Sequence, residues 1–347
     1  MQIFSEGQVH FYAENNQLRS AKVFFNPFRR IDRDLNVLFI ESLGKHNLRG
    51  IDAFGASGVR GLRLAKETGR FSEMIINDIK TEEVIKKNIS LNRLGMICHA
   101  SNINAFDLDS LGKFDYVDID PFGSPAGFLM VSIDTTKLGG VIAITATDTA
   151  ALYGKANRAC LRKYGSLSFK STYFNETGLR ILLKKAEETA NLKGFSIDPL
   201  FFDVRRHYVR AYFKLVSMRE TEKGYIYQCS RCINRTLSPK EKCDYCGAKM
   251  VRTGPLWLGK IFDRKIADKM YLLSMKEEKF SNYREYLDIL RKEIEIPTYY
   301  TTDSLASLLK TNEKKIEKFD ARTVLSPKGF RKEGSLQDVI KYYNSIL

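Results

Sequence analysis

The sequence of 347 residues lacks any apolar run long enough to cross a membrane. Its longest apolar stretches, residues 141–144 and 199–202, have only the length of a β-strand. It also lacks a signal-peptide-like apolar region, low-complexity tracts and internal repeats. These absences argue against membrane-spanning, secreted and fibrous proteins. We therefore expect a soluble cytoplasmic protein, and nothing in the chain indicates an obligate protein partner or a membrane partner.

Cysteine is scarce, with six residues, and a cytosolic chain should not hold a disulfide framework. Cys98 stands at the start of an apolar segment and Cys160 in a helix-like stretch, and both are expected to be buried small hydrophobic residues. The other four follow the pattern Cys-x2-Cys-x10-Cys-x2-Cys, which is typical of a tetrahedral structural zinc site. The alternative is a pair of redox dithiols, although nothing around them resembles thioredoxin. The expected zinc ligands are Cys229, Cys232, Cys243 and Cys246.

Acidic residues are too few to balance the basic ones, with 41 Asp and Glu against 56 Lys and Arg, so the net charge is +15. The excess is densest in residues 218–347, which hold 26 basic and 18 acidic residues. A basic surface favours a polyanionic partner, most simply a nucleic acid, because binding releases condensed counterions. The alternative is the lysine-rich surface of a heat-adapted protein. Charge does not distinguish RNA from DNA.

From residue 48 the sequence alternates between strand and helix patterns. This order predicts an α/β fold with an open, mostly parallel sheet that is covered on both faces and binds a ligand at the carboxyl ends of its strands. Strands are expected at 48–54, 74–77, 96–99, 114–119 and 140–146, helices at 58–68, 81–94 and 176–192, and an antiparallel hairpin at 195–203 and 207–216.

A polar segment at residues 219–224 predicts a boundary between a domain of residues 1–217 and a smaller α+β domain of residues 218–347. Residues 1–47 form an N-terminal extension with polar turns and a helix that ends at Leu43, with Asp32 as its cap. Thr81 is the expected cap of the helix at 81–94. Trp257 is expected to be a packing anchor of the small domain, followed by helices at 303–309 and from Leu336.

The segment Asp52–Gly61 joins the first strand of the sheet to its helix. Its small residues, Gly58 among them, let the backbone approach a ligand, and Gly61 permits close contact between helix and strand. The strict Gly-x-Gly-x-x-Gly spacing of a dinucleotide site is absent. Asp78 follows the second strand, where an acidic residue takes ribose hydroxyls. Asn104 and Ala105 follow the third strand and are expected to meet an adenine ring.

The octapeptide Asp118-Ile119-Asp120-Pro121-Phe122-Gly123-Ser124-Pro125 follows the fourth strand. A carboxylate and a carbonyl at such a turn can accept both N–H groups of an exocyclic amine, which directs its lone pair towards a methyl donor. The proline removes a competing donor, and the phenylalanine presents a flat face to a base. The alternative is an ordinary turn. With the acidic residue after the second strand, this turn favours S-adenosylmethionine over a nicotinamide cofactor.

Three phenylalanines and three arginines lie close together in residues 24–33. They predict either core packing flanked by surface charge, or a stacking platform with a phosphate clamp. A mixture of the two is favoured, with one of the aromatic residues functional.

Together these segments resemble the tRNA guanine-26 N2-dimethyltransferase family. The matches are the blocks at residues 24–27, 33–35, 56–61, 118–125, 145–150, 176–180, 206–210 and 254–259. The resemblance implies a class I methyltransferase domain, Rossmann-like and doubly wound, that uses S-adenosylmethionine to methylate a guanosine of tRNA once or twice. It also implies a zinc-containing, tRNA-binding C-terminal domain.

The resemblance further assigns roles to residues. Asp120 is the catalytic carboxylate, and Phe24, Pro121 and Phe122 form the guanine pocket. Arg33 and Arg60 contact the methionine carboxylate, with Arg63 as an alternative to Arg60. The cofactor set is completed by Gly58, Asp78, Asn104 and Ala105. The sequence departs from the family's pattern at Phe25, Asn104 and Gly55, where tyrosine, aspartate and a small non-glycine residue are usual.

The expected mechanism is an in-line displacement without a metal or a covalent intermediate, with the target base turned out of its stack between Phe24 and Phe122. Two alternatives keep the same turn: a guanine-N2 methyltransferase of ribosomal RNA and an adenine-N6 methyltransferase of DNA. A third is a non-catalytic zinc-ribbon protein that binds nucleic acid.

Overall fold

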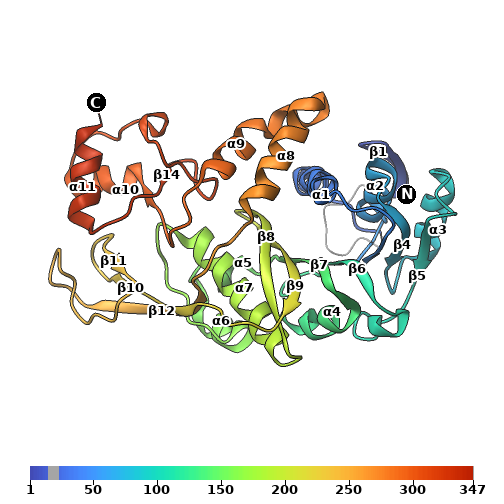
Figure 1. The fold of residues 1–347 in the computed structure, drawn as a ribbon, viewed down its shortest axis with the longest axis horizontal. Coiled ribbons are helices and arrows are strands. Elements are labelled where there is room, and N and C mark those ends of the chain that lie inside the picture. Colours follow the sequence, from blue (N-terminus) through green and yellow to red (C-terminus); the bar gives the residue numbers. More distant parts are fainter. Residues whose placement is uncertain (15–22, 347) are drawn as a thin grey trace.

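The structure is a computed structural model in which residues 1–14 and 23–346 are described. Its centre is a seven-stranded sheet with the order β5-β4-β3-β6-β7-β9-β8 (Figure 1). Strands β3 to β7 are parallel, whereas β9 runs antiparallel to both β7 and β8. The predicted open sheet and its antiparallel hairpin are confirmed. The strands are β3 (Leu48–Asp52), β4 (Phe71–Asn77), β5 (Cys98–Ser101), β6 (Phe114–Ile119), β7 (Thr136–Ala146), β8 (Phe195–Arg205) and β9 (Tyr208–Ser217).

Helices lie on both sides of this sheet, as Figure 1 shows with α1 and α2 above its central strands and α4 below. Helix α2 packs on β3 and β4, α4 packs on β6 and β7, and α7 packs on β8 and β9. The helices of this part are α1 (Arg30–Leu43), α2 (Val59–Thr68), α3 (Glu82–Leu91), α4 (Leu129–Thr135), α5 (Thr149–Leu152), α6 (Asn157–Tyr164) and α7 (Phe174–Asn191).

One predicted helix cap, Asp32, is wrong, and the other, Thr81, is correct in its position only. Asp32 lies inside the first turn of α1, after the N-cap residue Arg29, and its buried carboxylate pairs with arginines instead of capping amides. Thr81 does occupy the N-cap position of α3, but its side chain caps no amide of the helix. Its hydroxyl instead donates to the carbonyl of Ala56 at 2.6 Å, which ties α3 to the loop after β3.

An N-terminal hairpin was not predicted. Strands β1 (Gln2–Glu6) and β2 (Val9–Ala13) pair antiparallel, where only polar turns were expected. The amide oxygen of Asn88 accepts from the backbone N–H of Tyr12 at 2.7 Å, which fixes β2 against α3. The polar turns expected at residues 15–22 lie outside the described residues.

The C-terminal part contains a three-stranded sheet with the order β11-β10-β12 and a group of helices. Helices α8 and α9 pack in the same large hydrophobic cluster as the central sheet, whereas α10 and α11 enclose a smaller cluster around Phe330. The elements are β10 (Lys223–Cys229), β11 (Arg235–Thr236), β12 (Met250–Trp257), α8 (Arg264–Lys276), α9 (Arg284–Lys292), β13 (Tyr300–Thr301), α10 (Thr302–Leu309), β14 (Gly329–Phe330) and α11 (Leu336–Ser345).

Trp257 is buried, as expected of a packing residue, but it belongs to the large cluster of the sheet and not to that of the small domain. Its carbonyl accepts from Arg180 of α7 at 2.9 Å, which joins β12 to the sheet. Cys98 and Cys160 are buried as predicted, and burial raises the pKa of both thiols to about 12. Within the described residues, no helix has both the length and the apolar character needed to span a membrane.

Candidate active site

A cavity of about 540 Å³ opens at the carboxyl ends of β3, β4, β6 and β7. Gly58, Asn104 and Ala105 do not line it. This candidate catalytic cavity brings together seven of the residues that the sequence singled out: Phe24, Arg33, Arg60, Asp78, Asp120, Pro121 and Phe122.

The loop between β3 and α2 forms one wall because its glycines permit a close approach to β4. The N–H of Gly55 donates to the carbonyl of Asn77 at 2.8 Å. A Cβ on Gly55 would lie 2.5 Å from a methyl of Ile76, and one on Gly61 would lie 2.7 Å from the same side chain. The close helix–strand contact predicted for Gly61 is therefore present. Gly58 has a φ of +81°, which only glycine adopts without strain.

Asp78 lies directly after β4 and lines the cavity next to the loop between β3 and α2. Its carboxylate accepts from the backbone N–H of Ala56 at 3.0 Å and from that of Lys80 at 2.9 Å. It is half-buried, so part of the carboxylate faces the cavity. Asn104 is exposed, and its side chain accepts from the N–H of Phe106 at 3.1 Å. Ala105 packs against the core.

The turn after β6 is held in place by the end of β7. The N–H of Gly123 donates to Oγ1 of Thr147 at 2.7 Å, and the N–H of Thr147 donates back to the carbonyl of Gly123 at 2.8 Å. Gly123 has a φ of +88°, which again requires glycine. These bonds fix the backbone that carries Asp120 and Pro121 at the cavity wall.

Beneath this turn lies a buried charge cluster of three carboxylates and three guanidinium groups. Arg60 contacts Asp32 and Asp120, each at 2.7 Å. Arg210 contacts Asp118 at 2.5 Å and Asp32 at 3.1 Å. Breaking such a cluster leaves an unpaired buried charge, which typically costs about 3–5 kcal/mol. The members are Arg29, Asp32, Arg60, Asp118, Asp120 and Arg210.

Asp120 is the carboxylate of this cluster that reaches the cavity, with 18% of its side chain exposed. Burial alone would raise its pKa, but the guanidinium groups of Arg29 and Arg60 outweigh burial and hold the pKa below its usual value. Both guanidinium groups contact the same oxygen, Oδ2, at 3.1 and 2.7 Å. Among the described residues no donor contacts Oδ1. Asp120 is therefore an anion with one oxygen anchored and the other able to accept.

Asp52 also lines the cavity, but it forms no ion pair within the described residues, and the charge of nearby Arg60 only partly offsets its burial. It lies opposite Asp118 in the parallel pairing of β3 with β6. Asp118 forms an ion pair with Arg210, whereas Asp52 does not. Burial, together with repulsion from Asp118, raises the pKa of Asp52 to about 7. Within the part of the chain that the structure describes, Asp52 accepts one weak hydrogen bond, from the N–H of Gly61 at 3.2 Å.

Because the folded chain raises the pKa of Asp52 to about 7, native Asp52 holds a proton between pH 4 and 7 that the unfolded chain has lost. Its contribution to stability is therefore present below pH 4 and is lost as the pH rises through 7. Asp52→Asn cannot ionise. We therefore expect its free energy of unfolding, measured relative to that of wild type, to be higher at pH 8 than at pH 5 by more than about 1 kcal/mol. Urea unfolding of both proteins at the two pH values measures this gain, and a constant difference would contradict it.

Arg33 and Arg63 both meet Glu6 of the unpredicted hairpin. Arg33 lines the cavity and forms a bidentate pair with Glu6 at 2.5 and 2.7 Å. Arg63 contacts Glu6, Asp34 and Glu67 and does not line the cavity. Of the two alternatives left open by the sequence, only Arg60 thus faces the site.

The aromatic segment divides between core and cavity. Phe25 is buried against Phe4 and Phe11, and Phe28 is 76% exposed. Phe24 lines the cavity and contacts Phe122 edge to face, with ring centres 5.0 Å apart. A base stacked between two rings needs them about 7 Å apart, twice a carbon contact distance of about 3.5 Å. Insertion of a base there therefore requires Phe122, which is 57% exposed, to turn.

Several residues at the site were missed by the sequence analysis. Arg29 contacts Asp120 and lies over the ring of Tyr208 at 4.2 Å. Tyr208 and Arg210 lie within a block that carried the family resemblance, so a signal was present without a role. Asp32 gave a misleading signal, because an acidic residue near a helix start usually caps it.

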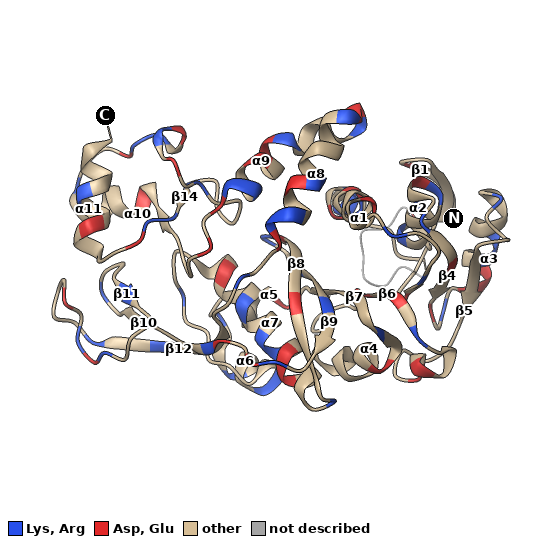
Figure 2. Cartoon of the chain, in the orientation of Figure 1, with Lys and Arg blue, Asp and Glu red and all other residues tan. Residues whose placement is uncertain are grey.

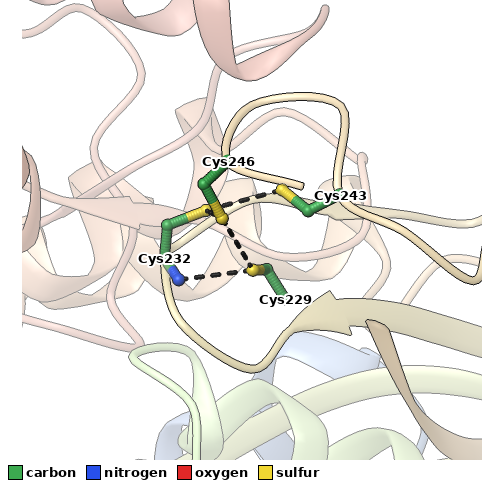
Figure 3. Close-up of side chains that lie close together, drawn as sticks. All are labelled: Cys229, Cys232, Cys243 and Cys246. Carbon is green, nitrogen blue, oxygen red and sulfur yellow. Dashed lines mark hydrogen bonds between the residues drawn. The ribbon is translucent and has the colours of Figure 1, made fainter. Parts of the chain in front are cut away.

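The four predicted zinc ligands converge, as Figure 3 shows. Their sulfur atoms all lie within 4.8 Å of one another, with the shortest separations at 3.4, 3.6 and 3.7 Å. Backbone N–H groups of Arg231 and Cys232 each point at the sulfur of Cys229 at 3.3 Å. Amides in this position stabilise thiolate charge. The cluster is compatible with a zinc site.

Comparison with known proteins places this chain. The family model for N2,N2-dimethylguanosine tRNA methyltransferases matches residues 7–336. The chain belongs to this family. Membership favours the main hypothesis over the DNA-adenine and non-catalytic alternatives.

Curated relatives extend over nearly the whole chain. A tRNA (guanine(26)-N(2)/guanine(27)-N(2))-dimethyltransferase of Aquifex aeolicus is 33% identical over 350 residues, covering 92% of this chain and 89% of its own. A tRNA (guanine(26)-N(2))-dimethyltransferase of Pyrobaculum arsenaticum is 32% identical, covering 99% and 98%. The solved complex of Trm1 from Pyrococcus horikoshii with S-adenosyl-L-methionine is 28% identical, with a TM-score of 0.85 and 99% of both chains covered. The fold is therefore that of the family throughout.

Proposed function

We propose that this protein transfers methyl groups from S-adenosylmethionine to the exocyclic N2 of a guanosine in tRNA, at position 26 and up to twice. The observation that carries this proposal is the turn Asp120-Pro121-Phe122, which opens onto the catalytic cavity in a chain of this family. The relative from Aquifex aeolicus is named for positions 26 and 27, so guanosine 27 is a second candidate target.

The catalytic cavity fits the cofactor. Gly55 lines the cavity and Gly58 permits the left-handed turn of the loop after β3, Asp78 presents a carboxylate suited to ribose hydroxyls, and Arg33 and Arg60 supply cationic groups for a carboxylate. We keep Asn104 and Ala105 as candidate adenine contacts. When bound, the sulfonium of S-adenosylmethionine supplies an electrophilic methyl group, so the protein mainly positions the reactants.

Asp120 positions the amine. The lone pair of guanine N2 is delocalised into the ring, and accepting one of its N–H bonds at Oδ1 localises that lone pair for attack. Arg29 and Arg60 fix Oδ2 and lower the pKa, so Asp120 is an acceptor and too weak a base to remove a proton beforehand. The carbonyl of Pro121 is the expected acceptor for the second N–H. The proton leaves N2 after the methyl group has arrived, when the nitrogen is cationic and acidic, and the carboxylate of Asp120 that accepts this N–H takes it.

The guanine itself is held by Phe24, Pro121 and Phe122. Pro121 is buried and rigid, while the exposed ring of Phe122 turns away from Phe24 to admit the base. A base must leave its stack to reach this cavity, as in other enzymes that modify bases.

We further propose that Cys229, Cys232, Cys243 and Cys246 bind one structural zinc ion. Four thiolates at about 2.3 Å in a tetrahedron place their sulfurs about 3.8 Å apart, close to the separations found. A shell of four thiolates leaves no position for a water nucleophile, so the metal holds the β10–β12 sheet together and takes no part in the chemistry.

Residues 218–347, with the zinc site and a net charge of +8, form the proposed tRNA-binding domain next to the methyltransferase domain of residues 1–217. Lysines and arginines lie along α8 (Figure 2). Phosphate contacts from such a surface select tRNA by shape more than by base sequence.

Asp78→Ala should weaken S-adenosylmethionine binding. Removing charge-assisted bonds to ribose hydroxyls costs about 1.5–3 kcal/mol, a rise in Kd of roughly 10- to 150-fold. Titration calorimetry measures it, with Asp115→Ala as the control, because Asp115 lies at the opposite end of β6 and pairs with Lys137. Equal affinities for wild type and Asp78→Ala would show that the ribose assignment is wrong.

The target position is tested with two tRNA transcripts that differ only at residue 26. Labelled methyl groups should enter the transcript with guanosine 26 and not the one with adenosine 26. Equal incorporation into both transcripts would place the target elsewhere, and incorporation abolished only by changing guanosine 27 would assign that position.

A further inference from the structure

A second cavity, of about 710 Å³, adjoins the catalytic cavity and shares Thr149 and His207 with it. Its walls come from the first turn of α7, from the turn between β8 and β9, and from residues 324–327 of the C-terminal part. No sequence motif predicted a role for it, and neither the cofactor nor the target base occupies it in the proposed function.

The charged side chains that line the second cavity are all basic. Lys155, Lys170, Arg205 and Arg206 line it, and none of its lining residues is Asp or Glu. Arg205 is paired with Asp203 at 2.8 Å, but the other three form no ion pair within the part of the chain that the structure describes. Unpaired cations on one concave wall favour an anion, and in an RNA-modifying enzyme that anion is a phosphate of the substrate.

Two buried polar atoms of residues that line the second cavity have no hydrogen-bond partner among the described residues: Ser171 Oγ and Asn175 Oδ1. Asn175 Nδ2 donates to the carbonyl of Leu325 at 2.7 Å, which fixes the orientation of the amide. Oδ1 is therefore an acceptor that awaits an N–H or O–H group. Burying such an atom without a partner is unfavourable, so its presence in a cavity points to a ligand that carries a donor.

An aromatic ring completes the second cavity. Phe174, the first residue of α7, is 37% exposed and packs against Tyr153 with ring centres 4.9 Å apart. One face is thus held by the protein while part of the ring stays accessible. Exposed aromatic rings beside phosphate-binding cations are the usual support for unstacked bases.

We propose that the second cavity binds the nucleotide next to the target guanosine in the RNA strand. Its phosphate meets Lys155, Lys170 and Arg206, a sugar or base donor meets Asn175 Oδ1, and its base lies against Phe174. The inference rests on the proposed function, because it requires the target base in the catalytic cavity. It means that the enzyme grips two successive nucleotides and therefore discriminates an RNA strand from free guanosine.

Phosphate binding in the second cavity is tested by the triple variant Lys155→Ala, Lys170→Ala, Arg206→Ala. The matched control removes three exposed lysines elsewhere, Lys66, Lys87 and Lys113. The slope of log Kd for tRNA against log salt should fall by about 0.7–0.9 for each phosphate that the triple variant no longer neutralises. The control should keep the wild-type slope, and both variants should keep the wild-type affinity for S-adenosylmethionine.

Base stacking in the second cavity is tested by Phe174→Leu, which keeps apolar packing on Tyr153 but removes the aromatic face. Wild type and Phe174→Leu are each tested with intact tRNA and with two abasic tRNAs. One abasic tRNA lacks the base on the 5′ side of the target guanosine, and the other lacks the base on its 3′ side. Stacking on one ring gives an effect of about tenfold or more on Kd. Wild type should bind one of the abasic tRNAs more weakly by that factor. Phe174→Leu should show the same weakening on intact tRNA and no further weakening on the abasic one.

Methylation by wild type is measured on the same RNAs. If wild type methylates tRNA while the variants behave like the control, the inference fails and the proposed function stands. If wild type methylates no tRNA, both fail. If the triple variant weakens binding but the Phe174→Leu and abasic effects add, the cavity holds phosphate alone and the nucleotide assignment is overturned. The last measurement is calorimetry with guanosine 5′-monophosphate. If this nucleotide binds in the second cavity while the variants leave tRNA binding unchanged, the cavity is assigned to a free nucleotide instead.

Discussion

Asp120→Ala should lower kcat by at least a factor of about 100, while the Kd for S-adenosylmethionine stays nearly unchanged. Removing one positioned hydrogen-bonding group from a transition state typically costs about 3 kcal/mol or more. Here the group removed is Oδ1, which holds the amine, whereas Asp78 and the loop after β3 remain to bind the cofactor. Single-turnover kinetics with saturating tRNA, together with calorimetry of cofactor binding, separate the two quantities.

The structure supplies a control for this prediction. Asp115→Ala deletes the same carboxylate from the other end of β6, where it pairs with Lys137 at 2.9 Å, and should keep near-wild-type turnover. Because Asp120 also neutralises part of the buried charge cluster, melting curves of both variants show whether the fold is intact. Near-wild-type turnover of a folded Asp120→Ala protein would place catalysis on another residue.

Purified protein should contain about one equivalent of zinc, and replacing Cys243 with serine should release it. Zinc binding to small thiolate sites contributes about 10–16 kcal/mol to folding, so the β10–β12 sheet should loosen and tRNA affinity should fall. Binding of S-adenosylmethionine should survive, because its cavity is built on the central sheet. Metal analysis and hydrogen exchange of residues 223–257 measure these effects.

Cys98→Ala is the matched control for the zinc site, since it removes a buried thiol that lies outside the cluster. It should keep the metal and the exchange pattern of β10–β12. Metal-free protein with native tRNA affinity and an unchanged melting profile would rule out a structural ion. A catalytic ion would show the reverse: an intact fold, retained tRNA affinity and abolished chemistry.

The central sheet was readable from the sequence because its signals are local. Strand β6 begins and ends at the residues that its apolar run predicts, and Gly61 sits against Ile76 as the helix–strand packing requires. The four cysteines come together as their spacing predicts. In each case the interpretation needs only neighbouring residues, together with the geometry of a strand, a turn or a tetrahedron.

The features that the sequence analysis predicted wrongly or missed depend on residues far apart in the chain. The sequence around Asp32 predicts a helix cap, but in the fold its carboxylate forms ion pairs with Arg60 and Arg210, which are 28 and 178 positions away. The role of Glu6 becomes visible only when the N-terminal hairpin lies against α2 and brings Arg33 and Arg63 to it. No periodicity or propensity encodes such pairs, because tertiary packing creates them.

Mass spectrometry of nucleosides from tRNA incubated with the protein and S-adenosylmethionine tests the proposed activity most directly. We expect N2-methylguanosine at early times, followed by N2,N2-dimethylguanosine, in a digest that otherwise matches untreated tRNA. Neither product should form with Asp120→Ala under the same conditions. Methylation at another atom of guanine or on another base, or dimethylguanosine formed equally well without Asp120, would contradict the proposed activity.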